Sequence, residues 1–287
     1  MNLAQVHVLT GDLQLLCGLH LAGIKLQHEY QLMTKTTPSV LHAAVSNTQP
    51  IHLLKIGRFG KHILLTFSTF SLILKVGYKT SIFVTRGECP AVVTDAEKIM
   101  ELVLVGPKGY LSLYYLDAQR HGGVSGYVHG IIPSEFNDKG LDIFDTLCTP
   151  AVVCSEIMRH SLVGHDKTIK AMLLQGNIIP GLDRDIVDEA LFLSGVHPAT
   201  NTANELSSFK ITSIVKYLRL LYTRLIECIR NEHGSDAKIP LTIVHSVFRR
   251  DGEPCPSCKT PIIKIKVDGT SSYVCPTCQP EIKNLLQ

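Results

Sequence analysis

The sequence contains little that would place the protein in a membrane or an export pathway. Its most apolar stretch, residues 63–74 (ILLTFSTFSLIL), is too short and too rich in Ser and Thr to cross a bilayer as a helix, so we expect buried strands there. The first residues show neither a basic region ahead of an apolar stretch nor a small-residue cleavage site, so no secretory signal is visible. These absences predict no membrane partner and an intracellular, reducing location.

Charged residues are also scarce, at 18% against 45% hydrophobic residues, which is typical of a folded globular protein. The 287 residues suffice for two domains, each with its own core. The net charge of +3 is uneven: residues 200–287 hold 12 Lys+Arg and 8 Asp+Glu, net +4, which leaves 16 and 17, net −1, for the first 199. A basic C-terminal part suits a polyanionic partner, although four charges alone are weak support.

Hydrophobic periodicity divides the chain into a strand-rich and a helical part. Leucines and a valine at spacings of three and four predict an amphipathic helix over residues 3–16. Short apolar runs separated by Gly, Pro or charged turns then predict the strands 51–59, 62–70, 72–77, 81–85, 101–105 and 110–116. After residue 142 the pattern predicts the helices 166–174, 184–193 and 209–230, with Thr200 and Asn201 available to cap the last. The expected fold class is α+β, with an N-terminal antiparallel β-sandwich or barrel, a flanking helix and a helical C-terminal part.

Two CxxC pairs near the C-terminus predict a metal site. The ligands would be Cys255 and Cys258 of CPSC with Cys275 and Cys278 of CPTC, and 16 residues separate the pairs. Each two-residue gap lets both thiolates of a tight turn point at one ion, and two such turns complete a tetrahedral zinc site. Four thiolates leave no open coordination position, so we expect structural Zn²⁺ rather than a catalytic ion. The segment between the pairs alternates as a hairpin should, with Asp268-Gly269 at its tip.

The other cysteines are Cys17, Cys89, Cys148, Cys154 and Cys228. In a reducing compartment we expect them to be buried thiols rather than disulfides.

Four blocks of sequence resemble the formamidopyrimidine-DNA glycosylase and endonuclease VIII family, in that family's order. They are VFRRDGEPC and SYVCPTCQ around the finger, IKAMLLQGNIIPG with DEALFLSGVHP, RFGKHI at 58–63, and DAQRHGG at 117–123. The second block resembles the family's helix-two-turns-helix signature. The resemblance implies a glycosylase-like β-sandwich over residues 1–141, a helix-two-turns-helix DNA-binding domain over 142–245, and a zinc finger over 246–287.

The resemblance also implies a function in base excision repair. Proteins of that family grip DNA, rotate a damaged base out of the stack and act as DNA glycosylases and AP (abasic-site) lyases. Their nucleophile is the amine of an N-terminal proline, which forms a Schiff base, and the following glutamate handles protons. The implied partner is DNA, damaged or abasic, and the chain is expected to be a monomer. In a eukaryotic source the family's role would place it in the nucleus.

This sequence departs from the family at the catalytic positions. Aligning LAQV at residues 3–6 with the family's LPEV places Met1 at the proline and Asn2 at the glutamate. The α-amine of Met1 could still form a Schiff base, whereas the amide of Asn2 cannot act as a general acid or base. Whether the chain is an enzyme is therefore not decided by its sequence.

The family's DNA-gripping positions are only partly kept. Its phosphate-binding Asn falls at Arg184 and its finger Arg at Thr270, while Tyr78 stands where the family has a residue that fills the gap left by the extruded base. The residues that we expect to contact DNA are Lys61, Arg120, Arg184 and Arg250. Glu189 matches the signature and is expected to have a structural role, and His197 with Pro198 to shape a turn.

Three functions stay open on the sequence alone. The first is a DNA-binding relative that has lost the chemistry. The second is an active glycosylase and AP lyase that uses the Met1 amine or begins upstream of this methionine. The third is a protein-interaction module built on the finger and the helical domain. Salt separates the third from the others, because phosphate binding weakens steeply as salt rises.

Overall fold

The computed structural model describes residues 1–26, 39, 49–77, 79–86, 98–129, 140–163, 167–201, 206–231 and 245–281. The chain divides into two compact units: the described residues up to His129 belong to the first, and those from Gly140 onward belong to the second. Within this described part, no helix combines the length and the apolar character that crossing a membrane requires.

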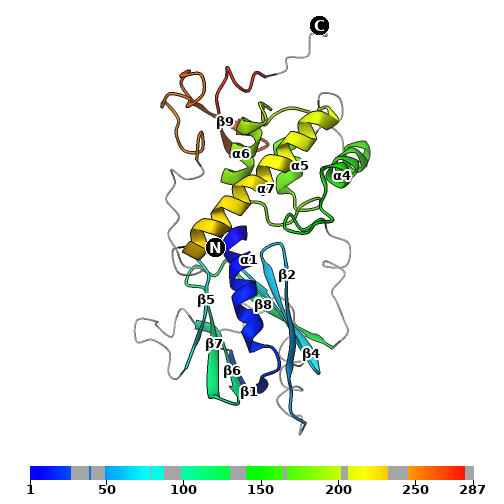
Figure 1. Ribbon diagram of the computed structural model, residues 1–287, viewed down its shortest axis with the longest axis vertical. Helices are drawn as coiled ribbons and strands as arrows, with labels where there is room; N and C mark the ends of the chain where they lie inside the picture. Colours follow the sequence, from blue (N-terminus) through cyan, green and yellow to red (C-terminus); the bar gives the residue numbers. More distant parts are fainter. Residues whose placement is uncertain are drawn as a thin grey trace. The chain divides into compact units, whose positions relative to one another are not determined.

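The first unit begins with a helix, as the periodicity predicts. Helix α1 spans Leu3–Asp12 and tightens into a 3₁₀ turn, η1, over Leu13–Leu16. All five apolar residues at spacings of three and four are buried: Leu3, Val6, Leu9, Leu13 and Leu16. The helix packs against strands β2 and β3, and Figure 1 shows it running beside the sheets.

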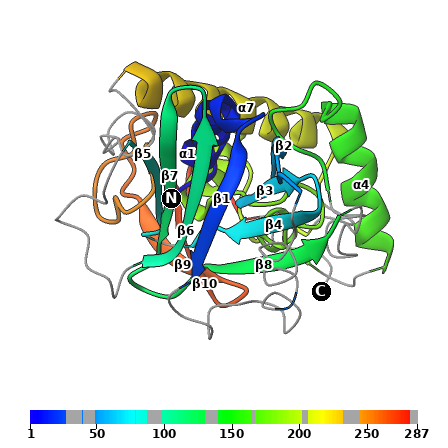
Figure 2. The same cartoon turned by 90° about the horizontal axis from the view of Figure 1, so that it is seen from below.

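Two four-stranded antiparallel sheets make up the rest of the first unit. One sheet has the order β1 (His20–Leu26), β6 (Lys98–Gly106), β7 (Gly109–Leu116), β5 (Ser81–Thr85). The other has the order β2 (Leu53–Phe59), β3 (His62–Phe67), β4 (Phe70–Lys75), β8 (Gly123–Val128). Figure 2 shows the two sheets as separate layers. Alternate side chains of β3 (Ile63, Leu65 and Phe67) are fully buried, and they share one core with β6 residues of the other sheet. This is the β-sandwich that the sequence predicts.

The strand prediction is right in most places and wrong in three. The turn after β3 lies at Ser68 and Thr69 rather than after residue 70, because Phe67 and Phe70 stack across it with ring centroids 4.6 Å apart. Strand β1 was missed, since Gly23 and a bulge break its alternation. Strand β8 was missed because its sequence, GVSGYV, has low β-propensity, and pairing with β4 places it in the sheet.

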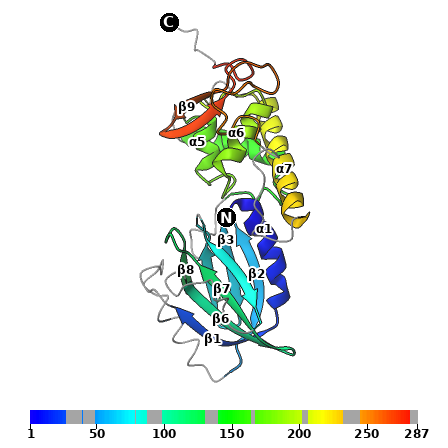
Figure 3. The ribbon, with the colours of Figure 1, turned by 90° about the vertical axis from the view of Figure 1, so that its left-hand side faces the viewer.

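The second unit is helical, with a small hairpin at its end. Its helices are α4 (Pro150–Val163), α5 (Ile169–Leu174), α6 (Arg184–Leu193) and α7 (Ser208–Asn231), and its strands are β9 (Ile263–Val267) and β10 (Thr270–Val274). Helices α6 and α7 agree with the prediction to within one residue. Helix α5 begins at Ile169, because Thr168 accepts a hydrogen bond from Ala171 N and caps it. Figure 3 shows the hairpin beside α5 and α6.

Two expectations about the second unit were wrong. Helix α4 was not predicted, because the apolar residues of PAVVCSEIMRHSLV do not keep to one face. In the structure, Pro150 occupies the first position of the helix, and Thr149 Oγ1 accepts a hydrogen bond from Val152 N at its start. Thr200 and Asn201 do not cap α7, which begins only at Ser208. Instead Thr200 accepts a hydrogen bond from Ile169 N, and Asn201 bridges to Thr168.

The cysteines outside the finger are less buried than predicted. Cys148 is buried, whereas Cys17, Cys154 and Cys228 are only partly buried. All of the described cysteines are free of disulfides, and Cys89 lies outside the described residues.

Candidate metal centre and nucleic-acid interface

The four predicted cysteines converge on one point. The sulfur atoms of Cys255, Cys258, Cys275 and Cys278 all lie within 4.8 Å of one another. Cys255 Sγ is 3.8 Å from Cys278 Sγ, and Cys258 Sγ is 3.3 Å from Cys275 Sγ. A tetrahedral zinc ion with Zn–S bonds of about 2.3 Å needs sulfur atoms about 3.8 Å apart. The donor set therefore fits structural zinc, closed by four thiolates.

The turns that carry the cysteines are built to hold them. Lys259 N donates to Cys255 O with the lysine at a φ of 65°, and Cys278 N lies 3.4 Å from Cys275 Sγ, as the tight turn of a CxxC pair requires. Hydrogen bonds from Thr260 lower the pKa of the Cys258 thiol to about 6, whereas burial raises the pKa of Cys275 and of Cys278. Thiolate is the form that binds zinc.

The predicted hairpin between the two pairs is confirmed. Strands β9 and β10 pair in antiparallel register, and the turn residues Asp268 and Gly269 have φ angles of 46° and 77°. Positive φ at both central residues is the geometry for which Asp-Gly is preferred.

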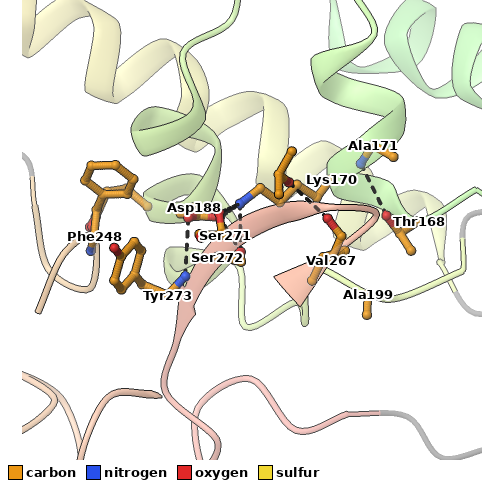
Figure 4. Close-up of polar contacts among 12 residues, drawn as sticks. Thr168, Lys170, Ala171, Asp188, Ala199, Phe248, Val267, Ser271, Ser272 and Tyr273 are labelled. Carbon is orange, nitrogen blue, oxygen red and sulfur yellow. Dashed lines mark hydrogen bonds and ion pairs between the residues drawn. The ribbon is translucent and has the colours of Figure 1, made fainter. Parts of the chain in front are cut away.

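A buried ion pair fastens this hairpin to the helices. Lys170 Nζ of α5 lies 2.7 Å from Asp188 Oδ1 of α6, and both side chains are at most 1% exposed. The same ammonium donates to Ser271 O at 2.8 Å and to Ser272 Oγ at 2.9 Å, both in β10 (Figure 4). Asp188 also accepts from Ser272 Oγ and from Tyr273 N. Burial lowers the pKa of Lys170 and raises the pKa of Asp188, and their mutual attraction opposes both shifts.

Glu189, the next residue along α6, holds the chain that enters the finger. Its carboxylate accepts hydrogen bonds of 2.6–2.8 Å from the backbone N–H groups of Ser246, Val247 and Phe248. Burial raises the pKa of this carboxyl, and the three N–H donors oppose the rise. The structural role predicted for Glu189 is thus to hold the backbone of residues 246–248 by three hydrogen bonds.

Two further contacts join the finger to the helices. Thr168 Oγ1 donates to Asp268 Oδ2 at 2.5 Å, and Gln279 Nε2 donates to Val196 O at 2.8 Å. The finger is therefore joined to the helices by an exposed contact at the tip of the hairpin and by a buried contact at Gln279, beyond the hairpin. Sequence reasoning missed the role of Lys170 and Asp188, although both stand inside the matched signature.

The catalytic and DNA-contact candidates of the first unit gather at one end of its sandwich. The α-amine of Met1 donates to Gly77 O at 3.2 Å, and Val76 N donates to Lys61 O at 2.9 Å. A Cβ on Gly77 would lie 2.6 Å from the carbonyl carbon of His121, so the loop of Arg120 packs directly on this residue. Arg120 is exposed and has a φ of 57°. Met1, Lys61 and the Arg120 loop are thus brought together.

The side chain of Asn2 is already engaged in the helix. Asn2 Oδ1 accepts from Gln5 N at 2.9 Å, and Gln5 Oε1 accepts from Asn2 N at 2.9 Å. This reciprocal pair is a capping box, which satisfies two backbone donors at the start of α1. Asn2 therefore has a structural role that explains an amide at this position.

A buried carboxylate under the Arg120 loop was not found from the sequence. Asp117 is 1% exposed, and its Oδ2 accepts a hydrogen bond from Gly122 N. Its neighbour Tyr115 donates to Lys75 O and accepts from Gly123 N, and burial raises the pKa of that phenol well above its usual value. These contacts fix both ends of the loop. The Asp of the DAQRHGG motif was the sequence signal from which this buried carboxylate could have been found.

The remaining candidates differ in whether their side chains are exposed or are held by other residues. Arg184 is exposed at the first turn of α6. Arg250 is tied down, with its Nε 2.8 Å from Glu253 Oε2 and its Nη1 3.0 Å from Ser246 O. Thr270 Oγ1 donates to Val267 O within the hairpin. Tyr78 lies outside the described residues.

Comparison with known proteins first gives the type of zinc finger and the fold. Residues 252–280 match the family described as "Zinc finger found in FPG and IleRS". The fold is that of formamidopyrimidine-DNA glycosylase structures. The Lactococcus lactis enzyme, determined non-covalently bound to AP-site DNA, aligns with a TM-score of 0.78 at 19% identity over 98% of this chain and 100% of that one. The Thermus thermophilus protein aligns with a TM-score of 0.75 at 20% identity over 99% and 100%.

Sequence relatives extend this similarity to nearly the whole chain. The formamidopyrimidine-DNA glycosylase of Rickettsia africae is 26% identical over 286 residues, covering 97% of this chain and 98% of the relative. That of Symbiobacterium thermophilum is 33% identical over 132 residues, 44% of this chain and 42% of the relative. The resemblance read from the four sequence blocks is confirmed: the chain is similar to formamidopyrimidine-DNA glycosylases over nearly its whole length, and residues 252–280 match an FPG-type zinc finger.

Proposed function

We propose that this protein recognises damaged or abasic DNA in base excision repair without efficient glycosylase chemistry. One observation carries the loss of chemistry. The position that holds the proton-handling glutamate in the family holds Asn2, whose amide is used in the capping box of α1. General acid–base groups typically contribute about 10²- to 10⁴-fold in rate. Zinc stabilises the finger and takes no part in the reaction, since four thiolates fill its coordination shell.

The residues that we assign to phosphate contact are Lys61, Arg120, Arg184 and Arg250. Arg184 has the strongest support because it is exposed at the N-terminus of a helix, where the helix dipole also favours an anion. Arg250 has the weakest support because its guanidinium is held by Glu253 and Ser246. The domain bounds 1–141, 142–245 and 246–287 are part of this proposal.

An AP lyase that uses the Met1 amine is the second candidate. The amine is partly buried and lies at the same end of the sandwich as Lys61 and the Arg120 loop. An α-amine with a pKa near 8 is partly unprotonated at neutral pH, the form that attacks the sugar carbon of an abasic site.

Borohydride trapping on abasic oligonucleotides separates these two candidates. The purified protein, with its N-terminus verified by mass, is incubated with duplex and single-stranded abasic DNA, and borohydride reduces any Schiff base to a covalent adduct. We expect salt-sensitive binding without an adduct. An adduct that disappears when the α-amine is blocked would contradict the leading proposal and establish the lyase. Binding that is insensitive to salt would contradict both and favour a protein-docking module.

The salt dependence of DNA binding tests the phosphate contacts. Replacing Arg184 with alanine is expected to reduce the magnitude of the slope of log K against log [salt] by about 0.9, because one phosphate contact is lost. The reverse substitution Thr270→Arg, which restores the family's finger arginine, is expected to raise it by about the same amount. Arg159→Ala, at an exposed position of α4, is the control and should leave the slope unchanged. Equal slopes for Arg184→Ala and Arg159→Ala would remove Arg184 from the interface.

A further inference from the structure

A cavity lies at one end of the first unit, where strands β6 and β7 turn. It has a volume of about 210 Å³, and Leu19 and Leu111 supply apolar lining. Leu19 packs so closely on Gly106 that a Cβ there would lie 2.6 Å from Leu19 Cδ2. Both leucines also pack against the sandwich core, so the apolar lining is held in place. The volume is below the roughly 300–1,000 Å³ of small-molecule sites and suits one or two side chains.

A large apolar side chain at this cavity is exposed to water. Leu15 of η1 lines it and is 86% exposed, although its neighbours Leu13 and Leu16 are buried. Leu19 and Leu111 are further apolar residues of the same lining. Apolar groups gathered around a concave surface are typical of protein-interaction sites.

The charge around the cavity is positive. Arg86 and Lys108 line it and are exposed, and none of the described lining residues is acidic. Two cations beside an apolar hollow are complementary to a segment that carries carboxylates beside an apolar anchor.

The cavity lies far from the proposed DNA-binding end of the same unit. Strand β7 begins at Gly109, which lines the cavity, and ends at Leu116. The next residue, Asp117, lies under the Arg120 loop. Its eight residues span about 24 Å at about 3.4 Å per residue. A ligand in the cavity therefore does not need to compete for the Met1, Lys61 and Arg120 end.

We propose that this cavity docks a short acidic segment of a partner protein, with a leucine or aromatic side chain in the hollow and carboxylates on Arg86 and Lys108. This surface is separate from the proposed DNA contacts. It would attach the protein to a partner while it is bound to DNA.

Peptide display tests the proposal. Phage bearing random twelve-residue peptides are selected on the full-length protein. We expect the enriched peptides to place Asp or Glu next to Leu or Phe. The best one, labelled with fluorescein, is then titrated by anisotropy. Leu15→Ser and Lys108→Glu are each expected to weaken its binding at least tenfold.

Matched controls use exposed residues outside the cavity. Leu54, 54% exposed on β2, is replaced by serine, and Lys55, also exposed on β2, by glutamate. Neither change should alter peptide affinity, and thermal melting checks that every variant is folded. An excess of abasic duplex should not displace the peptide.

Four results would overturn the proposal. They are a selection without enrichment of acidic peptides, equal affinities for Leu15→Ser and Leu54→Ser, displacement of the peptide by DNA, and self-association lost in Leu15→Ser. The third would make the surface a nucleic-acid site, and the fourth would make it an interface between two copies of this chain.

Discussion

Chelation of zinc is expected to unfold the finger and to lower the melting temperature of the whole second unit. Four thiolates make the ion part of the fold, and structural zinc in finger peptides binds with an apparent free energy of about 10–16 kcal/mol at pH 7. The effect should pass to the helices, because β10 supplies Ser271 O and Ser272 Oγ to the buried Lys170 ammonium. Once the hairpin is lost, that charge loses two of its partners.

The measurement is calorimetric melting with and without a chelator, beside metal analysis of the purified protein. Cys275→Ser should reproduce the effect of the chelator. Cys228→Ser, which changes a free cysteine of α7, is the control and should keep both zinc and stability. A protein that contains one zinc ion and melts unchanged after its removal would show that the ion does not support the fold.

Lys170→Ala is expected to destabilise the second unit by about 3–5 kcal/mol. The substitution leaves the carboxylate of Asp188, whose side chain is 0% exposed, without its cation. Ser272 Oγ and Tyr273 N still donate to it, but neither carries a charge. The loss would be read from urea unfolding followed by circular dichroism.

A double variant separates the buried charge from packing. Lys170→Met with Asp188→Asn removes both charges. The amide oxygen can accept from Tyr273 N while its NH₂ group donates to Ser272 Oγ, so we expect the double variant to recover most of the stability. The control is Arg159→Ala, which breaks the exposed pair with Glu156 at 2.6 Å and should cost less than about 1 kcal/mol. Similar losses for Lys170→Ala and Arg159→Ala would contradict the importance of the buried pair.

Much of the architecture could be predicted because it depends on local pattern. Apolar spacing predicted α1, α6 and α7, and the Asp-Gly turn predicted the β9–β10 hairpin. The CxxC spacing identified all four zinc ligands, since their geometry is set by turns of a few residues. Elements were missed where long-range pairing overrides local preference: the glycine-rich β8 is a strand because β4 lies beside it.

The candidate DNA site was predicted only in part. The motifs gave the positions of Lys61, Arg120, Arg184 and Arg250, but not the surroundings of each charge. Arg250 is bound to Glu253 and Ser246, whereas Arg184 is exposed, and no sequence pattern distinguishes the two. Leu15 falls outside the spacing of three and four that the buried apolar residues follow, but only the structure shows that it lies beside the cavity.

The sequence by itself thus determined the zinc ligands, the α+β class and the family resemblance, because these follow from residue types at fixed short spacings. Only the tertiary structure decided what each polar side chain does. It placed Lys170 with Asp188 beneath the hairpin, and Glu189 on the backbone that enters the finger. The partners of a buried charge come from segments as much as 102 residues apart, and folding alone brings those segments within hydrogen-bonding distance.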